Sequence, residues 1–117
     1  MKKKQYLSSG IYLINKKFKR NQFYHYFEEP DNVIIIPKIK NNYIIVRQKR
    51  EPINKKNFEF PMGWIDKSEK PLSTAKRELA EETGYISLKN PIKLLEFYAD
   101  PGRGNRACHF YYYYKKK

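Results

Sequence analysis

One helix, with residues that favour its two ends, separates two groups of strand-like segments in this chain. Apolar residues recur at helical spacing and form one stripe: Leu72, Ala75 and Leu79. Pro71 suits the first helical position, where no amide donor is needed, and Gly84 suits the position after the last turn. The sequence therefore predicts a helix over residues 71–83.

Short runs rich in β-branched and aromatic residues lie on both sides of this helix. They occupy residues 10–18, 22–27, 33–39, 43–48, 58–65, 92–99 and 107–114. The Lys-Asn-Asn stretch between the third and fourth runs predicts a hairpin, whereas residues 1–8 predict a frayed basic start and residues 49–57 a polar loop. This order of strands, one helix and strands predicts an α+β fold with a mixed or antiparallel sheet.

The size and charge of the chain limit the kinds of protein it can be. A chain of 117 residues predicts a single domain over 1–117, in which residues 1–29 form an N-terminal β-hairpin region. Its formal net charge is +13, from 25 basic and 12 acidic residues. The lysines are spread along the chain, so we do not expect nucleic acid to be its main partner. A positive surface still attracts anionic nucleotides at long range.

The single cysteine and the short apolar runs bear on compartment. Cys108 lies in an aromatic run, which predicts a buried structural thiol and not a nucleophile or a metal ligand. No stretch approaches the roughly 20 apolar residues that cross a bilayer. We therefore expect a cytoplasmic protein with no membrane partner.

The acidic residues are concentrated around the helix. Half of the 12 lie within residues 59–82, namely Glu59, Asp66, Glu69, Glu78, Glu81 and Glu82. Carboxylates three and four residues apart on a helix repel one another, and near its C-terminus they also oppose the helix dipole. A divalent cation among Glu78, Glu81 and Glu82 would remove this conflict, because Mg²⁺ and Mn²⁺ prefer oxygen ligands. The alternative is a solvated acidic face in which Arg77 pairs with Glu81.

The spacing of these residues resembles that of a known family. Gly63 is followed after five residues by Glu69, and after seven more by Arg77-Glu78-Leu79-Ala80-Glu81-Glu82-Thr83-Gly84-Tyr85. Residues 63–85 thereby resemble the Nudix box, G-x5-E-x7-R-E-U-x-E-E-x-G-U, in which U is usually aliphatic. Tyr85 is the one soft departure.

The resemblance implies a fold, a cofactor and a set of site residues. The fold would be a Nudix-type α/β/α sandwich with a mixed sheet. The cofactor would be Mg²⁺ or Mn²⁺, held by Glu78, Glu81, Glu82 and the backbone carbonyl of Met62. The same three glutamates would form the catalytic set, and Arg77 would tie the helix to Glu69.

The approach to the box resembles the ADP-ribose pyrophosphatase branch of the family. There a Gln-x-Arg precedes a Glu-x-Pro-x-Gly, which here corresponds to Gln48, Arg50, Glu59, Pro61 and Gly63. The resemblance implies hydrolysis of ADP-ribose to AMP and ribose 5-phosphate, with Arg50 and Glu59 lining the substrate site. Another nucleotide substrate (an oxidised nucleoside triphosphate, NADH or a dinucleoside polyphosphate) and a catalytically weak nucleotide- or RNA-binding domain remain open.

The end of the sequence departs from this branch. The branch carries a catalytic glutamate on a loop beyond the strand that corresponds to residues 107–114, and no residue before Lys117 matches it. We therefore expect a sandwich that is incomplete on its C-terminal side, with Glu81 as the candidate base. The uncovered sheet favours association, and the resemblance implies that the N-terminal hairpin region mediates a homodimer.

Overall fold

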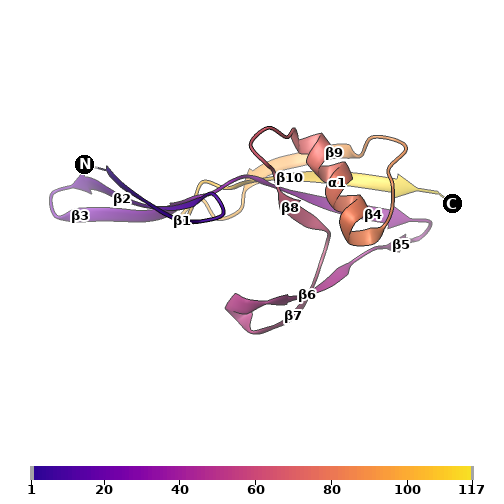
Figure 1. Cartoon of the computed structure of the whole chain (residues 1–117), viewed down its shortest axis with the longest axis horizontal. Helices are drawn as coiled ribbons and strands as arrows, with labels where there is room; N and C mark the ends of the chain where they lie inside the picture. Colours follow the sequence, from indigo (N-terminus) through magenta and orange to yellow (C-terminus); the bar gives the residue numbers. More distant parts are fainter. Residues whose placement is uncertain (1, 117) are drawn as a thin grey trace.

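The structure is a computed structural model that describes residues 2–116, and it is elongated. Its principal extents are 60 × 31 × 21 Å and its radius of gyration is 17.0 Å. A compact chain of this length would have a radius of gyration of about 13 Å. Figure 1 shows the cause: a central sheet carries the helix, while an N-terminal sheet and a separate hairpin extend away from it.

The central sheet is mixed, as the sequence predicted. Its strands are β4 (Asn32–Ile39), β5 (Asn42–Tyr43), β8 (Met62–Trp64), β9 (Ile92–Tyr98) and β10 (Ala107–Lys115). The order is β5-β4-β10-β9, and β8 also pairs with β4. The β4–β10 pair is parallel, and the other pairs are antiparallel. The start of β4 thus lies between the last residue of β8 and the start of β10.

The helix α1 (Pro71–Thr83) has the bounds that the sequence predicted. Gly84 has the left-handed backbone conformation that ends a helix, with φ of 80°, and its amide donates to the carbonyl of Ala80 at 2.9 Å. Local sequence signals thus fix both ends of this element.

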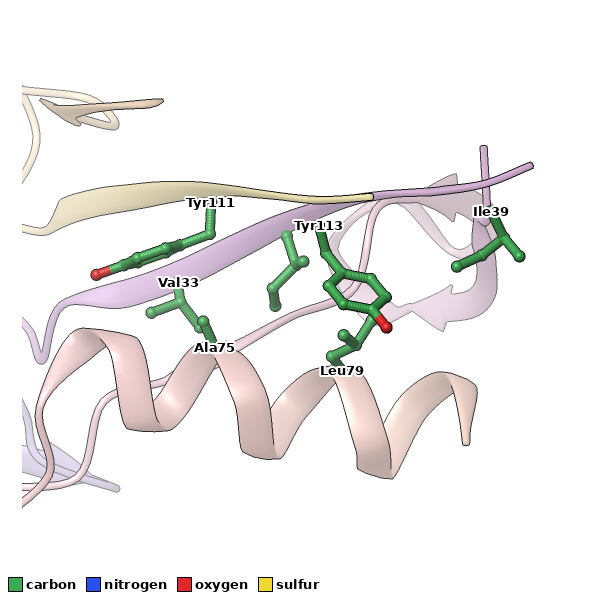
Figure 2. Close-up of a cluster of buried hydrophobic side chains, with 7 residues drawn as sticks. Val33, Ile39, Ala75, Leu79, Tyr111 and Tyr113 are labelled. Carbon is green, nitrogen blue, oxygen red and sulfur yellow. The ribbon is translucent and has the colours of Figure 1, made fainter. Parts of the chain in front are cut away.

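The hydrophobic core lies between α1 and one face of the central sheet. Figure 2 shows Ala75 and Leu79 of the helix facing Val33, Tyr111 and Tyr113 of the sheet. In β10, Tyr111 and Tyr113 are buried while Tyr114 is exposed, so the tyrosine run alternates between the two faces as expected.

The opposite face of the central sheet has no helical layer in the described part of the chain. Among residues 2–116, α1 is the one α-helix, so one of the two helical layers of the predicted sandwich is present. On the uncovered face, Phe97 and Phe110 stack with ring centroids 5.0 Å apart. Leu95 and Phe97 remain almost half exposed there.

The N-terminal region contains the expected hairpin and adds a third strand in place of the expected frayed start. It forms a three-stranded antiparallel sheet of β1 (Lys2–Ser8), β2 (Ile11–Lys19) and β3 (Gln22–Glu28). The basic start becomes strand β1 because its backbone pairs with β2. Lys4 also contacts both other strands, through an ion pair with Glu28 at 2.9 Å and the ring of Tyr12 at 4.1 Å.

The region expected to be a strand followed by a polar loop is instead a hairpin. The predicted strand 43–48 divides between β5 and β6 (Val46–Arg50), and the predicted loop contains a 3₁₀ turn (Glu51–Ile53) and β7 (Lys55–Glu59). Both hairpin strands consist mostly of polar residues, so the alternation of half-buried and exposed positions in β6 leaves no apolar pattern in the sequence. The predicted strand 58–65 divides at Pro61, which cannot donate to a ladder.

Cys108 is buried, as predicted for a structural thiol. Burial raises the pKa of this thiol above its ordinary value. Within residues 2–116, no helix is both long enough and apolar enough to cross a membrane.

Candidate active site

The predicted motif places a strand directly against the helix. Gly63 lies in the middle of β8, where the side chain of Glu78 from α1 packs over its backbone. A β-carbon at position 63 would lie 2.6 Å from Cγ of Glu78, and closer still to Cδ and Oε1. Position 63 therefore admits only glycine while the Glu78 carboxylate keeps its place.

Glu78 and Glu82 form an interacting pair of carboxylates on successive turns of α1. Burial first, and then the charge of Glu78, raise the pKa of Glu82 to about 7. A backbone hydrogen bond from Met62 to Glu82 acts in the opposite direction. Burial also raises the pKa of Glu78, although the charge of Arg77 opposes it. The pair is thus held together at an electrostatic cost.

Glu81 is directed elsewhere. Its exposed carboxylate accepts a hydrogen bond from Nη1 of Arg77 at 3.3 Å, which is the pairing expected for a solvated acidic face. In the described part of the chain, no three His, Cys, Asp or Glu side chains are grouped closely enough to hold a metal ion. The three-glutamate ligand set therefore stays a prediction, and the structure brings together only the pair of Glu78 and Glu82.

The expected tie between Arg77 and Glu69 is confirmed. Arg77 donates through Nε and Nη2 to the two carboxylate oxygens of Glu69, at 2.8 and 2.9 Å. The hydroxyl of Thr74 also donates to Glu69 at 2.6 Å. Because this bidentate pair joins the segment before the helix to the helix itself, it fixes where α1 begins relative to β8.

We expect the Glu69 contact to make stability depend on pH. The hydrogen bonds from Arg77 first, and then Thr74, lower the pKa of Glu69 from 4.5 to about 2. A lowered pKa means that this stabilisation is present above about pH 4.5 and is lost as the pH falls towards 2. Urea unfolding between pH 2.5 and 7 should show a loss of about 1–2 kcal/mol in the free energy of unfolding from this contact.

Two variants isolate this effect. Glu69→Gln should lower the stability at pH 7 and flatten its dependence on pH between 2.5 and 4.5. Asp66→Asn is the matched control, because Asp66 is 76% exposed and lies 3.9 Å from Arg77, where water screens the attraction. Equal pH profiles for Glu69→Gln and the unmodified chain would contradict the assignment.

Arg50 and Glu59 face each other on the β6–β7 hairpin. The Arg50 guanidinium donates to both oxygens of Glu59, with Nε 2.9 Å from Oε2. This hydrogen bonding lowers the pKa of Glu59, so Glu59 stays ionised. On the same hairpin, Nε2 of Gln48 donates to Oε2 of Glu82 at 3.4 Å. This contact connects the hairpin to the pair of Glu78 and Glu82.

The hairpin and the sheet enclose a cavity beside the glutamate pair. Its volume is about 270 Å³. The lining comes from four segments that lie far apart in the sequence, through Asn32, Gln48, Arg50, Glu59, Met62, Gly63, Trp64 and Arg106. The structure thus brings the predicted substrate residues Arg50 and Glu59 to the same cavity as Met62 and Gly63.

Larger cavities lie away from the glutamate pair. One of about 400 Å³ is lined by Phe18, Tyr24 and Tyr26 of the N-terminal sheet, and one of about 1010 Å³ lies between that sheet and the segment before α1. Neither is lined by Glu78 or Glu82. We place the candidate site at the smaller cavity, because two of its lining residues contact the perturbed carboxylates: Gln48 donates to Glu82, and Gly63 packs against Glu78.

Four lining residues were absent from the predicted site. Gln48 belongs to the Gln-x-Arg pattern that precedes residues 63–85, but nothing in its spacing indicated a contact with Glu82. Asn32, Trp64 and Arg106 belong to three different strands or loops, and their proximity follows from the pairing of β4 with β8 and β10. No sequence pattern carries that pairing.

The carboxylate pair fits a divalent cation. Glu78 and Glu82 supply oxygen ligands of the kind that Mg²⁺ and Mn²⁺ prefer. Gly63 leaves room for the Glu78 carboxylate, because a β-carbon at this position would overlap the Glu78 side chain. A cation would also relieve the repulsion that raises the pKa of Glu82.

Together the mixed sheet, the helix and the carboxylates packed over a glycine define a family. The family profile of the NUDIX domain matches residues 28–116, and the chain belongs to this family.

Two characterised relatives carry related names. The chain is similar to the ADP-ribose pyrophosphatase of Bacillus subtilis (strain 168), with 41% identity over 68 residues that cover 58% of this chain and 36% of the relative. It is also similar to the ADP-sugar pyrophosphatase of Mus musculus, with 36% identity over 87 residues that cover 68% of this chain and 38% of the relative. The aligned part thus spans under two fifths of either relative.

A solved structure supports the fold. The crystal structure of an ADP compounds hydrolase superposes with a TM-score of 0.77 and 19% identity, over 98% of this chain and 65% of that one. At this identity the likeness establishes the architecture, including the N-terminal sheet, because nearly the whole chain is covered.

Proposed function

We propose that this chain carries the active site of a metal-dependent hydrolase that cleaves ADP-ribose into AMP and ribose 5-phosphate. The observation that carries the proposal is the Glu78–Glu82 pair over Gly63, next to the cavity that holds Arg50 and Glu59. The names of the two pyrophosphatase relatives support an ADP-linked substrate over other nucleotides.

The glutamate pair would hold the metal. Glu78 and Glu82 would be the main ligands of Mg²⁺ or Mn²⁺, with Glu81 and the carbonyl of Met62 completing the set. When bound, the cation neutralises phosphate oxygens and makes hydroxide available near neutral pH. Glu81 would reach the cation only by leaving Arg77 and turning its exposed side chain towards the pair.

The other residues would position the substrate. Arg50 and Glu59 would contact it from the hairpin, with Glu59 kept ionised by Arg50. Gln48 would hold Glu82 towards the cavity, and Arg77 with Glu69 would fix the helix. Glu81 is also the candidate base that takes the proton from the attacking water, since its carboxylate is exposed to solvent.

A substrate panel tests the proposal. The purified chain with Mg²⁺ should release AMP from ADP-ribose, as followed by chromatography, and EDTA should stop the release. Faster turnover of an oxidised nucleoside triphosphate, NADH or a dinucleoside polyphosphate would contradict ADP-ribose as the substrate. The assignment of the active site would stand. No turnover on the whole panel, combined with RNA binding that weakens steeply with salt, would favour a binding domain instead.

A homodimer and a cytoplasmic location belong to the same proposal. The uncovered apolar face of the central sheet supports association with a second copy. The single cysteine, buried and free, is compatible with a reducing compartment. Sedimentation of the purified chain would test the dimer.

A further inference from the structure

The connection between β9 and β10 is attached to the N-terminal sheet. It comprises residues 99–106, and in Figure 1 it lies beside that sheet. The amide of Phe27 donates to the carbonyl of Arg103 at 2.8 Å, and the amide of Asn105 donates to the carbonyl of Phe27 at 3.1 Å. The side chain of Asn105 also accepts a hydrogen bond from the amide of Glu29 at 2.9 Å. Both backbone and side-chain contacts therefore hold the connection in place.

A close approach at Gly104 belongs to the same attachment. Phe27 and Gly104 form a parallel β-bridge. A β-carbon at position 104 would lie 3.1 Å from the carbonyl oxygen of Phe27 and 3.3 Å from Oε2 of Glu29. A side chain at this position would therefore push the connection away from β3. We call the contacts of this connection with Phe27 and Glu29 the clamp.

Hydrogen bonds within the connection fix its shape. The carbonyl of Asp100 accepts from the amides of Arg103 and Gly104, at 2.9 and 3.0 Å. At the far end, the carbonyl of Arg106 accepts from the amide of Ala99 at 3.1 Å. The clamp and these turns together thus fix the backbone from which the Arg106 side chain extends.

The side chain of Arg106 reaches the active-site cavity. It lines this cavity with Arg50, Glu59 and Trp64, and its guanidinium lies 6.0 Å from the ring centroid of Trp64. Arg50 is paired with Glu59, so these two charges balance. Within residues 2–116, no carboxylate forms an ion pair with Arg106. Arg106 therefore gives the cavity an unbalanced positive charge, which favours an anionic group there.

We propose that Arg106 anchors the diphosphate of the substrate, and that Asn105 and Gly104 are positioning residues that act through it. A guanidinium binds phosphate oxygens through charge-assisted hydrogen bonds, which depend on its direction as well as its charge. A displaced connection therefore weakens substrate binding while the pair of Glu78 and Glu82 stays intact. The N-terminal sheet thus contributes to the affinity of the active site in its own chain. The identity of the anion as a diphosphate rests on the function proposed above.

Calorimetry with imidodiphosphate, a diphosphate that resists hydrolysis, tests the anchor in the full chain with Mg²⁺. Arg106→Gln should raise its dissociation constant about tenfold or more, which corresponds to the loss of one charged contact. Arg103→Gln is the matched control, because it removes the same charge from the same connection. The side chain of Arg103 lines a different cavity, so this variant should keep the affinity.

A double-mutant comparison tests whether the clamp acts through Arg106. Asn105→Ala removes the acceptor for the amide of Glu29, and Gly104→Ala introduces the close contact with β3. Each should raise the dissociation constant of imidodiphosphate at least about threefold in the otherwise unmodified chain. Neither should have an effect in the Arg106→Gln background, because the anchor is already absent there. Additive losses would overturn the positioning role.

A second control and a check of the fold accompany the clamp variants. Gly102→Ala changes a glycine of the same connection, where a β-carbon would meet no atom closer than 4.0 Å, so it should keep the affinity. Circular dichroism shows whether each variant keeps its fold. The clamp is probed by two independent substitutions, so a folding failure of Asn105→Ala leaves Gly104→Ala to decide the outcome.

The outcomes separate the anchor from the proposed function. If ADP-ribose is hydrolysed, the clamp variants should raise KM with kcat nearly unchanged, whereas a mere loss of folded protein lowers kcat. No association of imidodiphosphate with the unmodified chain, or equal affinity in Arg106→Gln, would overturn the anchor even if hydrolysis occurs. Binding that Arg106→Gln weakens, in a chain that hydrolyses nothing, would support the anchor, and the proposed function would then fail alone.

Discussion

The Glu82→Gln variant is expected to lose hydrolysis while its fold becomes no less stable. Glutamine keeps the shape and the contact with Gln48 but removes the charge that holds the cation. Residues that only support a metal ligand cost about 10–100-fold in activity when they are changed, so loss of a ligand should exceed about 100-fold. Because the pKa of Glu82 is raised from 4.5 to about 7, its ionisation costs the folded chain stability, a cost that grows above pH 4.5 and is complete above about pH 7. The neutral residue should therefore stabilise the metal-free chain at pH 8 by on the order of 1 kcal/mol.

Calorimetry and thermal unfolding check both halves of this prediction. Titration with Mg²⁺ and Mn²⁺ should show binding to the unmodified chain, with and without nucleotide, and much weaker binding to Glu82→Gln. Glu51→Gln is the control, since Glu51 is an exposed glutamate in the 3₁₀ turn and lies outside the cavity. Unchanged turnover in Glu82→Gln would rule out the metal assignment.

The Gly63→Ala variant should also be inactive, but for a steric reason. The added methyl group would occupy the space of the Glu78 carboxylate. The end of a glutamate side chain can move away by rotation, so we expect a stability loss of only about 1–3 kcal/mol. The carboxylate pair would nevertheless be separated, and turnover and metal affinity should fall together, as with Glu82→Gln.

Gly102→Ala is the matched control for this variant. The nearest atom to a β-carbon at position 102 is 4.0 Å away, and the backbone there is not left-handed. It should leave activity and melting temperature nearly unchanged. If Gly63→Ala retained full activity, Glu78 would not be required in the position that the structure gives it.

Features with a local cause were predictable from the sequence. The bounds of α1 follow from Pro71 and Gly84, and its buried face follows from the spacing of Ala75 and Leu79. The alternation of Tyr111 and Tyr113 with their neighbours follows from the geometry of any strand. Each of these depends on residues within a few positions of one another.

Features that depend on a distant partner were missed. Strand β1 is basic and exposed, so only its pairing with β2 makes it a strand. The β6–β7 hairpin is likewise polar on both strands, so most of it was interpreted as the polar loop over residues 49–57. Exposed polar strands give no periodic signal, since neither face must be apolar.

The candidate site divides in the same way. The motif identified Glu78, Glu82 and the need for glycine at position 63, because all belong to one continuous segment. The direction of the Glu81 side chain towards Arg77, and the contact of Gln48 with Glu82, follow from which side chains tertiary packing places within reach.

The sequence by itself determined the family and the helix, since one 23-residue segment carries both, and the same segment holds the three glutamates that we propose as cation ligands. Tertiary structure alone decided that Asn32, Trp64 and Arg106 share a cavity with that segment. The physical reason is that the pairing of β4 with β8 and β10 joins positions 28 or more residues apart, and nothing in the order of residues along the chain records which strands become neighbours.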